Sequence, residues 1–328
     1  MAIPNIQYCP GTLAEGYDSY SRNCLKRMFT NRKVSHILPY DSPDSKYEEN
    51  QIFRDNHKRI SISGVQEKFS VLLEKNKLRL IKEGEQGNYI LKPIPHAGKR
   101  SNQMPANEHL TMQIARQVYQ IETAENALIF FKNGEPAYLT KRFDVKDDGS
   151  KLAKEDFATL AGKTPQTHGE HYKYEGTYLE IFELMKKYLP AYRLEIPKLY
   201  QVLVFNYLFS NGDAHLKNFS ILETPLGDHR LSPAYDLLNT RMHVEDEVFA
   251  LEGLLSRKDA QGTIYTQFTT LAEKIELTEK QFSTIMKTML GGAEHVEQFV
   301  KASFLNEQSK RNYFQAYQRR LKRLKPKL

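Results

Sequence analysis

The stretch that decides the predicted fold is NGDAHLKNFS, residues 211–220. It follows residues 197–210, which are apolar on nearly every side and carry Pro197 in a first-turn position, a pattern that predicts a buried helix. The next residues, 219–222, predict a short strand. We therefore expect a rigid buried element to hold the polar side chains between helix and strand beside a cleft.

Two of these polar residues have the spacing of a kinase catalytic loop. Asp213 and Asn218 are five residues apart. In such a loop the Asp orients and deprotonates the acceptor hydroxyl, and the Asn binds metal. Lys217 lies between them, where its ammonium group can neutralise charge on a migrating phosphoryl group. The spacing is common by chance, but its place after an apolar helix and before a short strand favours phosphoryl transfer.

A second acidic residue follows the next short β segment. Asp236 ends the sequence SPAYD, 18 residues beyond Asn218. Mg²⁺ prefers hard oxygen ligands, with one or two protein groups completed by phosphates and water. Asn218 and Asp236 are therefore candidate metal ligands. The alternative is that Asp236 is an acidic N-cap for the segment that follows.

A lysine ends one of the predicted strands. Lys92 closes YILK, residues 89–92, before Pro93 stops the strand. A lysine in this position can contact nucleotide phosphates as a point charge, and Glu108 is a candidate partner for it. Two alternatives stay open, because edge lysines deter aggregation and helix N-termini favour acidic residues without any function.

The sequence SISGVQEK, residues 61–68, predicts a turn before the first strand pair. With one glycine it offers fewer unhindered backbone N–H groups than GxGxxG, so it is a weak phosphate cradle. Its two hydroxyl groups, on Ser61 and Ser63, would sit over the γ-phosphate of a bound nucleotide.

Predicted strands dominate the first part of the chain, and predicted helices dominate the second. We therefore predict an α+β protein with a β-rich N-lobe at 1–143 and a helical C-lobe at 144–328. The expected strands are 69–73, 77–81, 89–92, 128–131 and 137–140, with a helix that begins at an N-cap on Asn107. The expected later helices are 154–161, 177–188, 197–210, 279–290, 294–303 and 307–325.

Composition excludes several classes of protein. The chain has 328 residues, 40% of them hydrophobic, which supports a packed core and argues against disorder. No apolar run approaches the roughly 20 residues of a membrane span, and the first residues lack the regions of a signal peptide. Two cysteines, Cys9 and Cys24, cannot build a disulfide framework. We expect a soluble protein of the reducing cytoplasm with no membrane partner.

The net charge of +7 comes from one end of the chain. Residues 310–328 contain eight Lys or Arg and no acid, and the rest of the chain has 39 basic and 40 acidic residues. Phosphate-backbone binding needs a basic face, which only this last segment offers. A solvated basic helix face is the simpler interpretation of it.

Together these motifs resemble those of HipA-like serine/threonine kinase toxins. The resemblance runs from about residue 59 to the C-terminus, and it implies the two-lobe protein-kinase-like fold and the use of Mg²⁺ and ATP. It also implies phosphorylation of an aminoacyl-tRNA synthetase, which blocks charging and halts growth. The motifs that carry it are SISGVQEK at 61–68, YILKP at 89–93, NEHL at 107–110, KRFD at 141–144, DAHLKNFS at 213–220 and AYD at 234–236.

The resemblance assigns roles to single residues. It implies that Asp213 is the catalytic base and that Asn218 and Asp236 bind Mg²⁺. It implies that Ser61 is the autophosphorylated loop serine, with Ser63 as the second serine of a Ser-x-Ser loop. Family members commonly have Glu where Lys141 stands, so only backbone contacts to adenine are expected there. The ATP-binding residues that it implies are Lys92, Ser63, Gly64, Val65, His215 and a hinge with Lys141 and Phe143.

The start of the chain departs from the longer HipA proteins. About sixty residues precede the serine loop, which is similar to the shorter HipT-type toxins. In those, a small HipS-like protein replaces the missing subdomain, and a HipB-like antitoxin binds DNA, so the kinase meets DNA only indirectly. This architecture favours tryptophanyl-tRNA synthetase as the substrate, with glutamyl-tRNA synthetase next. We expect no zinc knuckle, because Cys9 and Cys24 lack two further ligands.

Two other functions remain as alternatives. A small-molecule phosphotransferase of the aminoglycoside-kinase type shares the Asp-to-Asn spacing, but the helical half has no dense acidic run for a cationic substrate. A non-catalytic binding module of a DNA-bound antitoxin complex would use the basic C-terminal segment. The presence of Asp213, Asn218, Asp236 and Lys92 argues against that second alternative.

Overall fold

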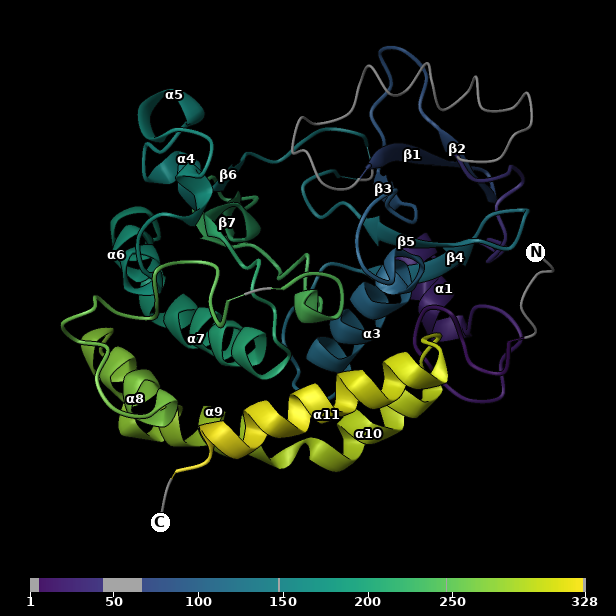
Figure 1. The fold of residues 1–328 in the computed structure, drawn as a ribbon. Helices are drawn as coiled ribbons and strands as arrows, with labels where there is room; N and C mark the ends of the chain where they lie inside the picture. Colours follow the sequence, from purple (N-terminus) through teal and green to yellow (C-terminus); the bar gives the residue numbers. More distant parts are fainter. Residues whose placement is uncertain (1–5, 44–66, 147, 246, 327–328) are drawn as a thin grey trace. The chain divides into compact units, whose positions relative to one another are not determined.

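The computed structural model describes residues 6–43, 67–146, 148–245 and 247–326 (Figure 1). The chain forms two compact units. Unit 1 consists of residues 1–113, 124–151 and 298–310, and unit 2 of residues 114–123, 152–297 and 311–328. The predicted lobes, 1–143 and 144–328, stay a prediction.

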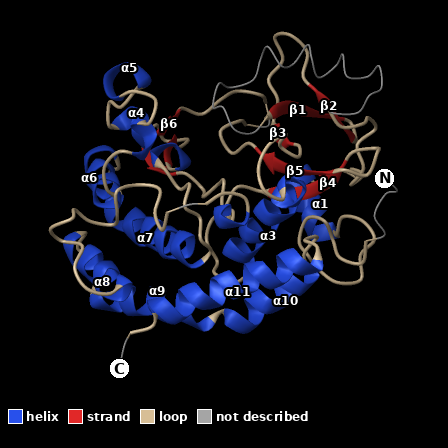
Figure 2. Ribbon diagram, viewed as in Figure 1, coloured by secondary structure: helices blue, strands red, loops and turns tan. Residues whose placement is uncertain are grey.

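Unit 1 is built on a five-stranded antiparallel sheet, whose strands are red in Figure 2. The strand order is β2-β1-β3-β5-β4. A left-handed residue, Lys75, turns the chain from β1 into β2, and Gly134 with φ +87° turns it from β4 into β5. The strands are β1 Phe69–Glu74, β2 Lys77–Leu80, β3 Tyr89–Lys92, β4 Asn126–Phe130 and β5 Pro136–Lys141.

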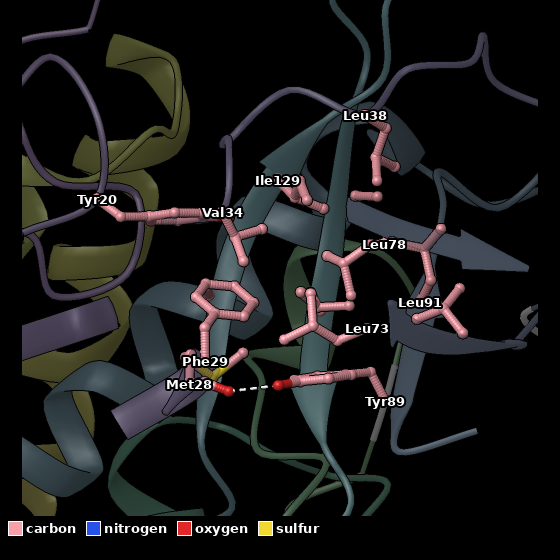
Figure 3. Packing of buried hydrophobic residues seen from close by; sticks show 14 of the residues in the cluster. Tyr20, Met28, Phe29, Val34, Leu38, Leu73, Leu78, Tyr89, Leu91 and Ile129 are labelled. Carbon is pink, nitrogen blue, oxygen red and sulfur yellow. Dashed lines mark hydrogen bonds between the residues drawn. The ribbon is translucent and has the colours of Figure 1, made fainter. Parts of the chain in front are cut away.

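The core of unit 1 lies between this sheet and the short helix α1, Arg22–Phe29 (Figure 3). Side chains alternate in β1, so Val71 and its neighbours two residues away face the core. Ser21 caps α1 by accepting a hydrogen bond from Cys24 N. Tyr89 in β3 donates a hydrogen bond of 2.5 Å to Met28 O, which ties the sheet to the helix.

Helix α3, Met104–Gln117, follows a 3₁₀ turn at Ser101–Gln103, and the boundary between the units falls inside it. The expected N-cap at Asn107 is wrong, because the helix begins three residues earlier. Asn107 is instead a buried residue within the first turns, where Thr111 Oγ1 donates to its carbonyl oxygen. All residues from 105 to 115 are buried, so the side chain of Glu108 points into the protein interior.

Unit 2 is mainly helical around a small three-stranded sheet of order β6-β7-β8. Its strands are β6 Lys154–Asp156, β7 Ser220–Glu223 and β8 His229–Leu231. Its helices are α4 Phe157–Leu160, α5 Pro165–His168, α6 Tyr178–Tyr188, α7 Tyr192–Leu208, α8 Ile264–Lys274 and α9 Glu279–Gly291, with 3₁₀ turns at Tyr172–Tyr174, Leu216–Asn218 and Thr240–Met242. The units share α10, Ala293–Ala302, and α11, Glu307–Leu324.

Helix α7 is the central element of unit 2. It contacts α6 and α9, and it is buried almost throughout its second half, as its apolar sequence predicts. The expected start at Pro197 is wrong: the helix begins at Tyr192 and carries Pro197 inside. The ring of Phe209, just after the helix, stacks on Tyr317 of α11 at 5.0 Å. The rigid end of α7 therefore leads directly into residues 211–218.

The expected helix at 154–161 is also partly wrong. Residues 154–156 form strand β6, because they pair antiparallel with β7 in the register Lys154↔Leu222 and Asp156↔Ser220. Asp156 then caps the four-residue helix α4 by accepting a hydrogen bond from Thr159 N. This arrangement places the Asp156 carboxylate beside the segment that leads into β7.

Among the described residues, no helix combines the length and apolar character that crossing a membrane requires.

Candidate active site

The site residues of unit 1 centre on a buried ion pair. Lys92 Nζ lies 2.6 Å from Glu108 Oε1, and the two side chains are 4% and 1% exposed. An isolated charge in such a place would cost several kcal/mol, so each side chain needs the other. A strand lysine paired with a helix glutamate is the arrangement that holds nucleotide phosphates in protein kinases.

Local structure explains the position of Lys92. It is the last residue of β3, pairs in register with Tyr138 of β5, and precedes Pro93, which cannot continue the ladder. Its ammonium group lies 5.3 Å from the centre of the Tyr138 ring, within cation–π range. The alternative of an exposed edge lysine does not hold, because β3 lies between β1 and β5 and the side chain is buried.

The predicted hinge follows β5. Lys141 is the last residue of this strand, and Phe143 lies two residues beyond it; both are half-buried. Between them, Arg142 binds Asp144 at 2.6 Å and donates its backbone N–H to Asn88 O. The segment, which turns at residues 143–144, is therefore held in place by its neighbours. The predicted loop residues Ser61, Ser63, Gly64 and Val65 lie outside the described residues.

In unit 2, the loop after α7 carries Asp213 on an exposed position. Tyr174 donates a hydrogen bond of 2.8 Å to Asp213 Oδ1, which orients the carboxylate. The Tyr174 ring also meets His215 edge-on at 5.1 Å. Burial, with a contribution from Lys173, lowers the pKa of His215 to about 3. The imidazole is therefore neutral at physiological pH.

Lys217 in the same loop has an acidic partner from another element. Its Nζ lies 2.7 Å from Asp156 Oδ2 at the start of α4. Burial alone would lower the pKa of Lys217, but the hydrogen bond and charge of Asp156 outweigh it and raise that pKa. The ammonium group is therefore charged and held in one place, which suits a group that stabilises phosphoryl oxygens.

Asn218 and Asp236 offer the hard oxygen atoms that Mg²⁺ prefers. Asn218 Oδ1 is buried and has no hydrogen-bond partner among the residues that the structure describes. Asp236 has a left-handed backbone, φ +56°. Tyr235 donates to Lys217 O at 2.9 Å, so the residues next to the two candidate ligands are linked. These residues fit a magnesium site, where the ion would neutralise phosphate charge.

The sequence alone did not reveal three of these contacts. Tyr174 lies in the 3₁₀ turn Tyr172–Tyr174, where the sequence suggested no chemistry. The sequence predicted that Asp156 is part of a helix. Its partner Lys217 is 61 positions away in the chain, and no local pattern indicates a contact over that separation. The sequence indicated no role for Tyr235 beyond its place next to the candidate ligand Asp236. A fold that brings these segments together is needed to find such partners.

Comparisons with known proteins place these features in context. A model of the HipA-like C-terminal domain matches residues 60–296. The protein named "Putative kinase Y4dM" of Sinorhizobium fredii is 31% identical over 261 residues, which cover 74% of this chain and 61% of that relative. The protein named "Putative kinase" of Haemophilus influenzae is 24% identical over 333 residues, covering 94% and 93% of the two chains. The chain thus spans less than two thirds of the first relative and nearly all of the second.

Two solved structures share the fold. HipA of Shewanella oneidensis MR-1, solved with HipB and operator DNA, aligns with a TM-score of 0.61 at 18% identity, over 86% of this chain and 72% of HipA. The proinflammatory kinase CtkA of Helicobacter pylori aligns with a TM-score of 0.51 at 12% identity, over 78% of this chain and 92% of CtkA. The predicted α+β kinase-like fold is confirmed.

Proposed function

The chain belongs to the family of the HipA-like C-terminal domain, and from that premise we propose that it is a Mg²⁺- and ATP-dependent protein serine/threonine kinase. The buried pair of Lys92 and Glu108 carries this proposal. Burying two charges is costly, and in protein kinases a strand lysine paired with a helix glutamate holds the nucleotide phosphates.

The loop after α7 supplies the transfer chemistry in this proposal. Asp213, oriented by Tyr174, positions the acceptor hydroxyl and takes its proton as the new O–P bond forms. Lys217, held by Asp156, stabilises the negative charge on the migrating phosphoryl group. Asn218 and Asp236 would hold Mg²⁺. The ATP-binding residues of the proposal are Lys92, Ser63, Gly64, Val65, Lys141, Phe143 and His215.

We assign the kinase to a toxin–antitoxin system of the cytoplasm. Its support is the family match and the likeness in fold to a HipA that was solved with HipB and operator DNA. The proposed partners are a HipB-like antitoxin and a small HipS-like protein, and DNA is met only through the antitoxin. The proposed substrate is an aminoacyl-tRNA synthetase, tryptophanyl first and glutamyl next.

Autophosphorylation is the second activity in this proposal. Phosphate on Ser61 or Ser63 would add about −1.5 to −2 charge to a loop that is proposed to cover the phosphates of ATP. Repulsion between the two would displace the loop and weaken ATP binding, so the kinase would inactivate itself.

An intact-mass experiment tests the proposed function. The wild type and Asp213→Asn are incubated with Mg²⁺ and ATP, with and without each synthetase, and peptides covering residues 59–68 are mapped. We expect phosphate on the loop and on tryptophanyl-tRNA synthetase with the wild type alone. Transfer to the synthetase without loop phosphate would remove self-inactivation only. No transfer to any protein would contradict the kinase and favour a binding module.

A further inference from the structure

Two cysteines of unit 1 lie against each other at the start of α1. Cys9 and Cys24 are 0% and 2% exposed, and neither forms a disulfide. The Cys24 thiol donates a hydrogen bond to Cys9 Sγ. Gly11 touches both sulfur atoms: its N–H group donates to Cys9 Sγ at 3.4 Å, and a β-carbon at this position would collide with Cys24 Sγ. The close approach of the two sulfurs to this backbone therefore requires glycine.

The groups around Cys9 favour its ionised form. Ser21, the N-cap of α1, donates its backbone N–H to Cys9 Sγ at 3.1 Å, and a helix N-terminus stabilises a thiolate. The hydrogen bond from Cys24, helped by Ser21, outweighs burial and lowers the pKa of Cys9 to about 5. The same hydrogen bond, together with burial, raises the pKa of Cys24. At neutral pH the pair therefore consists of one thiolate and one thiol.

Few other titratable groups act on the two sulfurs. Tyr20 and His36 lie near Cys9, and the pKa of His36 is lowered by burial, so its imidazole stays neutral above pH 6.5. Arg27 and Glu125 lie near Cys24 and bind each other at 2.8 Å. The charge around the pair therefore stays constant between pH 6.5 and pH 8.

This arrangement suits redox chemistry better than metal binding. Structural zinc takes four ligands, and the described residues contain no group of three or more His, Cys, Asp or Glu side chains that could hold a metal ion. The other polar neighbours are two hydroxyl groups, on Thr12 and Ser21, which lie 3.3 Å from each other. A thiolate is the nucleophile in thiol oxidation, and an adjacent thiol can complete a disulfide.

The Cys9 sulfur lies one side chain below the surface. The hydroxyl groups of Thr12 and Ser21 both bond to it, and these residues are still 7% and 4% exposed. The backbone here forms a turn in which Cys9 N donates to Ala14 O at 2.8 Å, and residues 14–19 are exposed. A surface turn held by local bonds opens at a lower cost in free energy than the core. Opening of this turn gives a small oxidant access to Cys9.

We propose that Cys9 and Cys24 form a reversible disulfide when the protein meets a hydroperoxide. The Cys9 thiolate attacks the outer peroxide oxygen, the O–O bond breaks, and Cys9 becomes a sulfenic acid. The departing alkoxide takes the proton of the Cys24 thiol and leaves as the alcohol. The Cys24 sulfur then attacks the Cys9 sulfur, the S–O bond breaks, and hydroxide leaves. The two sulfurs lose two electrons, and the hydroperoxide gains them.

The disulfide would join the turn at 9–16 to the first residues of α1. In a reducing compartment such bonds are usually transient and report on oxidants, because thiol reductants reverse them. This modification site is separate from the proposed nucleotide site, and its oxidation does not require the kinase to be active.

Oxidation of the reduced full chain by hydrogen peroxide tests the proposal. Remaining thiols are blocked with a maleimide after unfolding, and intact mass counts them. We expect the folded wild type to lose two hydrogen atoms and take up no maleimide, and dithiothreitol should restore both thiols. The rate should change less than about twofold between pH 6.5 and pH 8, because Cys9 is already ionised. In urea, where both thiols have ordinary pKa values, it should rise more than about tenfold.

Three variants assign the roles of the two cysteines and of the cover. Cys24→Ser should stop at a Cys9 sulfenic acid, which dimedone traps. Cys9→Ser should keep Cys24 reduced and take up one maleimide. Thr12→Ala removes part of the cover and should speed disulfide formation at least about twofold, whereas Thr288→Ala in α9 is the matched control and should keep the wild-type rate. Circular dichroism shows which variants fold, and if a cysteine variant does not, the pH profile of the wild type decides.

Three results would overturn the proposal. One is a folded wild type that keeps both thiols under peroxide conditions that oxidise the chain in urea. Another is a disulfide that joins two chains, seen as a doubled mass. The third is a rate for the folded wild type that rises with pH as steeply as in urea, which would show that Cys9 is an ordinary thiol.

Discussion

Lys92 of β3 and Glu108 of α3 form an ion pair of 2.6 Å inside unit 1, and both side chains are almost completely buried. The two residues are 16 positions apart in the chain. Their pairing sets the position of α3 against the sheet, because a shift of one residue in either element would bury two separate charges. The pair therefore links the stability of unit 1 to the proposed nucleotide site.

Removing one member of this pair should destabilise the protein. Glu108→Ala leaves Lys92 buried without a counter-charge, and we expect the free energy of unfolding to fall by about 3–5 kcal/mol. The double variant Lys92→Met, Glu108→Leu should regain most of this stability and remain unable to autophosphorylate. Urea unfolding and intact mass measure the two effects. A double variant that is less stable than the single one would contradict the prediction.

Tyr174→Phe tests the orientation of Asp213. The change removes the hydrogen bond to the carboxylate and leaves the ring contact with His215. A hydrogen bond to a charged group contributes about 1.5–3 kcal/mol, so the rate of autophosphorylation should fall roughly tenfold or more. Tyr192→Phe, an analogous change at the start of α7, is the control and should keep the wild-type rate. Equal rates for Tyr174→Phe and wild type would mean that Asp213 needs no such support.

Two substitutions at Asp156 separate its role as a helix cap from its role as a partner of Lys217. Asn caps helices as well as Asp, so Asp156→Asn should keep the stability of unit 2 within about 1 kcal/mol. It removes the charge opposite Lys217, and we expect the rate of phosphoryl transfer to fall several-fold. Asp156→Ala should lose the same activity and about 1 kcal/mol of stability besides. If phosphoryl transfer is slower than in the wild type only for Asp156→Ala, the rate depends on the helix cap and not on the charge opposite Lys217.

Asp236 is held in the left-handed region, where Asn and Asp are tolerated better than other side chains. Asp236→Asn should therefore fold as well as the wild type but lose the Mg²⁺-dependent part of ATP binding. Asp236→Ala should lose that binding and about 1–2 kcal/mol of stability. Calorimetric titration with an ATP analogue, in Mg²⁺ and in chelator, checks the first effect. Binding by Asp236→Asn that still responds to Mg²⁺ would exclude Asp236 as a ligand.

The stability of the protein should depend on pH through His109 of α3. Burial lowers the pKa of this imidazole from 6.5 to about 4, so the unfolded chain binds the proton more readily than the folded one. Stability contributed by neutral His109 is complete above pH 6.5 and is lost as the pH falls towards 4, by about 3 kcal/mol in total.

His109→Phe should flatten this dependence between pH 6.5 and 4, as followed by urea unfolding at several pH values. The matched control is His295→Phe on the exposed side of α10, which should keep the wild-type slope. The same slope in His109→Phe and wild type would show that another group causes the pH dependence.

Much of unit 1 was predictable from local patterns. The strands expected at 69–73 and 77–81 match β1 and β2 almost to the residue, and Pro93 marked the end of β3. The start of α3 was not predictable, because Asn107 suits an N-cap and nothing in the sequence shows that the helix is buried on all sides. Similarly, residues 154–156 became a strand only because β7 offers them an edge to pair with.

The sequence by itself determined the kinase-like fold and the identity of the residues proposed to carry the chemistry, Asp213, Lys217, Asn218, Asp236 and Lys92. It did so because their types and spacings are local properties of short segments, each next to an apolar helix or strand. Tertiary structure alone revealed Tyr174 as the partner of Asp213 and Asp156 as the partner of Lys217, and it showed that the candidate Glu108 does pair with Lys92. Such contacts join distant segments, and they form only when the burial of apolar side chains has brought those segments together.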